Sequence, residues 1–221
     1  MLTGNPMKRL IALSIAFTVL AADADAGTAS CKYKQNEADD FTGERLVKVD
    51  WVDMTGWASS TFNRTIGGRK DIEVAAESAG GHSLLKFRLK VSDAVQNPPR
   101  EQDLYSALYV PTGSSLEITM ADESIIELMV DEAVRGKSRA KYDQGSYVIT
   151  SKFTVRYSLD AELAERLVNE DVVYLRLAAQ SHKYDFVTDK GSIEFNINKK
   201  AQQALTKVVG CLNQALSEEV S

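Results

Sequence analysis

The residue types that most often carry out chemistry form no recognisable metal or nucleophile motif in this sequence. His82 and His182 are far apart, and neither belongs to a His-x-x-x-His pair or lies near a cysteine. The segment Ser83–Lys86 has the Ser-x-x-Lys spacing of penicillin-recognising enzymes. The residues around it alternate as in a strand, where positions three apart point to opposite faces. We therefore expect no metal, no other cofactor and no local catalytic motif.

Catalysis by dispersed carboxylates leaves no such local pattern. The two carboxyl groups of a glycosidase come from different strands, so their spacing in the sequence is not diagnostic. The chain has 31 acidic residues, and a suitable pair can always be chosen among so many. A small secreted or periplasmic hydrolase that acts on envelope polysaccharide therefore stays an alternative.

Aromatic residues are better candidates for a binding surface. Trp51, Trp57, Tyr105 and Tyr109 have rings that can stack on sugars or peptides while their polar atoms form hydrogen bonds. The alternation around Trp51 places its side chain on the inward face of a strand, with the core. Trp57, Tyr105 and Tyr109 are therefore the aromatic members of the candidate binding surface.

Cations at two places extend this expectation. Arg176 lies between two leucines of an apolar strand, where its charge needs water or a partner. We include it in the candidate binding surface. Lys86, Arg88 and Lys90 alternate along another strand and form a basic stripe, which is either solvated or meets an acidic partner or lipid headgroups.

The first 26 residues are typical of an export signal. Lys8 and Arg9 precede the uncharged run Leu10–Ala22, which is too short to cross about 30 Å of hydrocarbon. An A-x-A pattern ends at Ala26, so we expect cleavage there. Met7, directly before the basic pair, is an alternative start. A periplasmic or secreted location follows from this signal.

Residues 27–221 are expected to form one globular domain. Hydrophobic residues make up 44% of the chain and charged residues 26%, as in ordinary globular proteins, and the net charge of −5 argues against nucleic acid as a partner. No transmembrane segment is expected in the mature chain. In an oxidising compartment, Cys31 and Cys211 predict a disulfide between its two ends. A lipoprotein anchored at Cys31 is the less favoured alternative, because no leucine-like residue precedes that cysteine.

Hydrophobic periodicity predicts an α+β fold built mainly from an antiparallel meander. Helical spacing predicts a short helix near 160–169 and a C-terminal helix near 198–218, and residues 31–42 are expected to be an exposed lead-in. A β-sandwich with an appended C-terminal helix is the alternative. Strands are predicted over 46–52, 71–74, 83–91, 104–110, 115–120, 125–130, 147–157, 172–177 and 192–196.

These patterns together favour an exported bacterial accessory or binding protein without enzymatic activity. Its partner is expected to be a protein or a polysaccharide, which the sequence does not identify. The hydrolase is one alternative. Another is an inhibitor of a hydrolase, which would present a protruding loop such as Asn97–Gln102.

Overall fold

The structure is a computed structural model that describes residues 30–38, 44–55, 70–181, 184, 187 and 191–218. The predicted signal peptide and Trp57 lie outside the described residues, so both stay predictions. The helices are α2 (Glu101–Tyr105), α3 (Ala161–Asn169) and α4 (Lys199–Ser217). The strands are β1 (Tyr33–Ala38), β2 (Arg45–Val49), β3 (Val52–Asp53), β4 (Lys70–Ala79), β5 (His82–Val95), β6 (Tyr109–Val110), β7 (Ser115–Met120), β8 (Ile125–Met129), β9 (Val134–Arg135), β10 (Lys137–Asp143), β11 (Ser146–Ser158), β12 (Val172–Ala178) and β13 (Ser192–Asn196).

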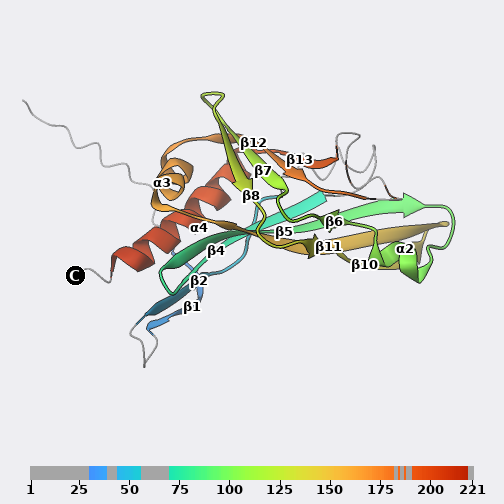
Figure 1. Cartoon of the computed structure of the whole chain (residues 1–221), viewed down its shortest axis with the longest axis horizontal. Coiled ribbons are helices and arrows are strands. Elements are labelled where there is room, and N and C mark those ends of the chain that lie inside the picture. The colour runs from blue at the N-terminus through green and yellow to red at the C-terminus, as the bar shows by residue number, and fades with distance from the viewer. Residues whose placement is uncertain are drawn as a thin grey trace, which may run out of the picture.

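All of these strands pair in antiparallel fashion (Figure 1). The large sheet has the order β1-β2-β4-β5-β11-β10, and β3 pairs with the same β4 as β2 does. The second sheet has the order β13-β12-β7-β8, and β6 and β9 form a small pair. The α+β class and the mainly antiparallel sheet are therefore confirmed, as is the C-terminal helix.

Strict alternation of side chains gives the large sheet one apolar face. Leu85, Phe87 and Leu89 of β5 are buried, whereas the cations between them point to the opposite face, which we call the outward face. The β4–β5 hairpin turns at Gly80 and Gly81, whose φ angles of 58° and 75° favour glycine. The apolar face needs a covering layer, and two different kinds of element supply it.

Helix α4 covers one end of the apolar face, and the second sheet covers the other. The helix packs against β2, β3, β4 and α3 with an apolar stripe that includes Leu205, Val208 and Leu212. Beyond the helix, Phe87 of the large sheet and Leu175 of the second sheet line the same small internal cavity. Helix thus covers one half of the apolar face, and sheet packs on sheet in the other half.

A disulfide joins the beginning of the described domain to α4. Cys31, two residues before the start of β1, is bonded to Cys211, and their Cα atoms are 5.6 Å apart. The predicted disulfide is confirmed. The Tyr33 hydroxyl also donates a hydrogen bond to the Cys211 carbonyl oxygen at 3.0 Å. Strand β1, which was expected to be a loose lead-in, is therefore held against both β2 and α4.

The predicted strand over 104–110 is wrong. Residues 104 and 105 are the end of helix α2, which begins after Arg100. The Asp103 carboxylate accepts hydrogen bonds from the Arg100 backbone N–H at 3.3 Å and from the Arg100 guanidinium at 3.1 and 3.2 Å. A charged cap with acidic residues in the first turn favours a helix there, and only Tyr109–Val110 is extended.

Trp51 also differs from its prediction. One extra residue between β2 and β3 forms a bulge opposite β4, so the Trp51 ring lies on the outward face over Arg88 and not in the core.

Candidate functional site

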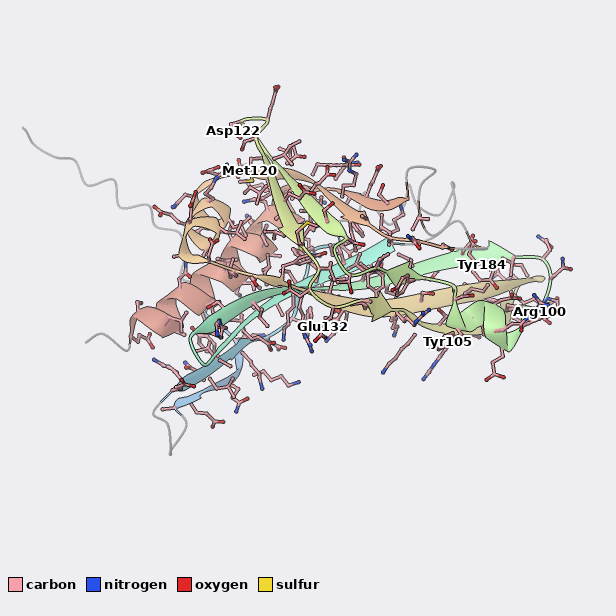
Figure 2. The ribbon with its side chains drawn as sticks, viewed as in Figure 1. Arg100, Tyr105, Met120, Asp122, Glu132 and Tyr184 are labelled. Carbon is pink, nitrogen blue, oxygen red and sulfur yellow. A yellow bond between two sulfur atoms is a disulfide. The ribbon has the colours of Figure 1, made fainter. Side chains whose placement is uncertain are left out.

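The structure brings together two of the predicted binding residues around a third that the sequence did not single out. The Arg135 guanidinium lies 5.1 Å from the ring centre of Tyr105 and 4.6 Å from that of Tyr109. Tyr105 is 67% exposed, and Arg135 is also exposed. We call these three residues the tyrosine–arginine cluster. Figure 2 shows Tyr105 at the α2 end of the molecule, remote from the C-terminal end of α4.

Short strand pairings fix the geometry of this cluster. Tyr109 of β6 is directly opposite Arg135 of β9. On its other side, the Tyr109 backbone exchanges hydrogen bonds of 2.9 and 2.7 Å with Gln180. Gly136 lets the segment before β6 approach β10 closely, because a Cβ at this position would lie 3.2 Å from the Leu108 Cβ. The backbone of Tyr109 is therefore held on both sides.

The cluster has the chemistry of a recognition site for an anion joined to an apolar ring face. A guanidinium over tyrosine rings is stabilised by the cation–π interaction and keeps its fork of N–H donors in the plane of the group. That fork matches a carboxylate or phosphate, and an exposed tyrosine ring offers a flat apolar surface beside it. The sequence alone did not suggest Arg135, because only the pairing of β6 with β9 brings it to the tyrosines.

Arg176 is placed elsewhere, and no interaction within the described chain joins it to the cluster. It lies on β12 in the second sheet, opposite Glu117 of β7 and Glu194 of β13. Its Nη2 donates to Glu117 Oε1 at 2.6 Å. Burial, followed by a hydrogen bond with Glu194, raises the pKa of the neighbouring Tyr174 to about 12. The predicted need of Arg176 for an acidic partner is therefore met inside the sheet.

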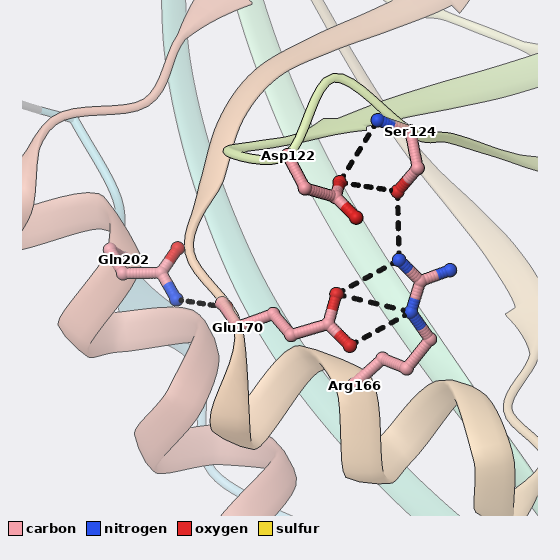
Figure 3. A network of polar contacts seen from close by, with 5 residues as sticks. All are labelled: Asp122, Ser124, Arg166, Glu170 and Gln202. Carbon is pink, nitrogen blue, oxygen red and sulfur yellow. Dashed lines mark hydrogen bonds and ion pairs between the residues drawn. The ribbon is translucent and has the colours of Figure 1, made fainter.

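A polar network connects the second sheet to the helices (Figure 3). Arg166 of α3 donates to the Ser124 hydroxyl at 2.8 Å, and Ser124 in turn donates to Asp122 at 2.6 Å in the β7–β8 turn. Arg166 also pairs with Glu170 at 2.8 Å, and Gln202 of α4 donates to the Glu170 carbonyl oxygen at 3.1 Å. Each of these five side chains is bonded to another part of the protein, so we interpret the network as one that holds the second sheet to the helices.

A hydrolase site would be expected in a concave region lined by carboxylates, and the groove beside α4 is such a region. It has a volume of about 1010 Å³ and its lining includes Asp53, Asp171 and Lys200. Burial favours the neutral form of Asp53, but hydrogen bonds from Lys200 and Thr55 outweigh it and lower the pKa of this carboxyl. A general acid needs the opposite shift. Within the described ranges, no three His, Cys, Asp or Glu side chains gather as ligands for a metal ion.

Comparisons with family models, with curated proteins and with solved structures gave no match. Among the helices that the structure describes, none is long and apolar enough to span a membrane. The functional assignment therefore depends on the residues themselves.

Proposed function

We propose that this chain is an exported bacterial binding protein without enzymatic activity, and that its tyrosine–arginine cluster binds an acidic polysaccharide. The observation that carries the proposal is the exposed Arg135 guanidinium between the rings of Tyr105 and Tyr109. Sugar units with carboxylate groups offer both an anion for the guanidinium and a C–H face for a tyrosine ring.

The rigidity of the cluster supports this assignment. Tyr109 is paired on both sides, and Tyr105 is the last residue of helix α2, whose first turn is held by the Arg100–Asp103 ion pair. Side chains that are fixed before binding lose less conformational entropy when the ligand arrives. A tyrosine that is 67% exposed gains little from burial in the free protein, so a ligand that covers the ring accounts for its position better than folding does.

Export is supported by the disulfide. The bond between Cys31 and Cys211 is of the kind that persists in an oxidising compartment. This agrees with the predicted signal peptide and with a periplasmic or secreted location. The hydrolase alternative has less support, because the Asp53 carboxyl in the groove beside α4 is held ionised by Lys200.

The test is titration calorimetry of the oxidised protein with oligosaccharides of galacturonic or mannuronic acid, and with neutral dextran oligosaccharides as the control ligand. Tyr105→Ala and Arg135→Gln should each weaken binding by at least about 30-fold, the effect of removing a central aromatic or arginine contact. Arg135→Lys should also weaken it, because lysine lacks the planar fork.

Tyr142→Ala is the matched control, since Tyr142 is 62% exposed and contacts Tyr147 outside the cluster. It should bind the uronic acid oligosaccharides as the unchanged protein does. The proposal is wrong if no acidic oligosaccharide binds, or if Tyr105→Ala and Arg135→Gln bind as tightly as Tyr142→Ala.

A further inference from the structure

The outward face of the large sheet is divided into two electrostatically different halves. On the β4–β5 half, each cation of the predicted basic stripe has an acidic partner. Lys86 pairs with Glu77, Arg88 with Glu73 at 3.0 Å, and Lys90 with Asp71 at 3.6 Å. The stripe that the sequence indicated is therefore neutralised by the neighbouring strand.

The β10–β11 half carries cations without such partners. We call the exposed residues Lys137, Arg139 and Lys141 of β10 and Lys152 and Arg156 of β11 the cationic face. The register places them on the outward side, because Ser138 and Ser151 between them point inward and share a hydrogen bond of 2.6 Å. None of the five forms an ion pair or hydrogen bond with another side chain in the described ranges.

Like charges in this region are directly opposite one another. Lys137 of β10 is paired with Lys152 of β11, and Lys152 is paired with Lys90 of β5. Directly opposed like charges destabilise an antiparallel sheet. At the far end of the row Lys137–Lys152–Lys90, Asp71 pairs with Lys90 at 3.6 Å, and Asp143 is the one acid at an outward position of β10 and β11.

We infer that the cationic face is a docking surface for an anionic phospholipid membrane. Charge complementarity is the basis: five long cationic side chains extend from adjacent strands, and each can reach a different phosphate. All five side chains are exposed on one side of the sheet, which fits a planar array of headgroups better than a single polymer strand. The chain has a net charge of −5 overall, so its acidic excess lies on other surfaces and orients this face toward the membrane.

Vesicle flotation with the oxidised full protein tests this inference. One set of vesicles contains equal parts of phosphatidylglycerol and phosphatidylcholine, and the other contains phosphatidylcholine alone. Binding should be confined to the first set and should weaken strongly as ionic strength rises from about 0.01 M to 0.15 M, where the screening length falls from about 30 Å to 8 Å. Each Lys or Arg near an anionic membrane contributes roughly a fivefold factor to binding.

Two variants with the same loss of charge separate local from overall electrostatics. Lys137→Gln/Lys141→Gln should lower the partition coefficient by about 30-fold. The control Lys199→Gln/Lys207→Gln removes the same two charges from α4, which lies in the layer behind the large sheet. It should bind vesicles within about threefold of the unchanged protein, because these two residues are not on the face that docks.

Three results would overturn the inference. These are equal binding to both sets of vesicles, equal loss in the two double variants, and tighter binding to soluble polyphosphate than to anionic vesicles. The inference does not depend on the ligand of the tyrosine–arginine cluster. Tyr105→Ala should float with anionic vesicles as the unchanged protein does, so a failure of one proposal leaves the other open to its own test.

Discussion

Breaking the Cys31–Cys211 bond should destabilise the protein mainly by releasing its unfolded chain. The bonded cysteines are separated by 180 residues in the sequence, and a closed loop of this length corresponds to about 5 kcal/mol of lost unfolded-state entropy. Losses of about 2–5 kcal/mol are typical when a native disulfide is removed. A chain of this size changes its melting temperature by about 2–4 °C per kcal/mol. We therefore expect reduction to lower the melting temperature by roughly 4–20 °C.

The native structure offers a reason why the fold itself should survive reduction. Strand β1 stays paired with β2, and the Tyr33 hydroxyl stays bonded to the Cys211 carbonyl oxygen. The assay is thermal unfolding followed by circular dichroism, with and without reductant. Cys31→Ser in oxidising buffer is the matched variant, because it removes the bond and keeps the buried sulfur of Cys211, which is 3% exposed.

Reduction and Cys31→Ser should lower the melting temperature by the same amount. Equal melting temperatures for the oxidised and reduced protein would refute the reasoning, because closing the 180-residue loop with the disulfide would then add nothing to stability. A collapse of the native spectrum on reduction would also refute it, since the bond would then be holding the folded state together.

Three further predictions concern polar and charged side chains. The buried Tyr157 hydroxyl has no hydrogen-bond partner within the described chain, so Tyr157→Phe should raise the free energy of unfolding by about 1 kcal/mol in urea titrations; a loss of that size would mean that the hydroxyl is bonded. Tyr174 has a folded pKa of about 12 against about 10 when unfolded, so its contribution to the free energy of unfolding is complete below pH 10 and is lost as the pH rises toward 12. Tyr174→Phe should therefore reduce the fall in the free energy of unfolding between pH 10 and pH 12. An unchanged fall would exclude Tyr174 as its source. Lys152→Gln removes the middle charge of the row Lys137–Lys152–Lys90. It should raise the free energy of unfolding by roughly 0.5 kcal/mol in the same titrations. A less stable variant would show that the three lysines do not repel one another.

The parts of the fold that could be predicted are those where burial forces a period. The alternation in β5 and the helical spacing in α4 each place one apolar face on the core, and the end points of β7 agree with the predicted 115–120. Edge strand β10 has no such signal. Its sequence runs Lys-Ser-Arg-Ala-Lys-Tyr-Asp, and its extended conformation comes from pairing with β11.

The candidate site shows the same boundary between local and long-range information. Tyr105 and Tyr109 could be chosen as exposed aromatic candidates by residue type, but Arg135 reaches them through a pairing of two short strands that are far apart in the sequence. Arg176 had an unusual local position, and its explanation was an ion pair with Glu117 on a neighbouring strand. Local patterns therefore indicated that a side chain needed a partner without indicating which partner it had.

Strand β10 connects the two proposed surfaces. Helix α2, which carries Tyr105, packs against β10, and the same strand carries Lys137, Arg139 and Lys141 on its outward side. Figure 1 shows α2 and β10 together at the end of the molecule away from the C-terminus. A protein docked on a membrane through the cationic face would thus hold the tyrosine–arginine cluster beside the sheet edge, close to the membrane surface. An acidic polysaccharide bound there would lie near like-charged lipids, so the cations of β10 would also reduce the repulsion between the two ligands.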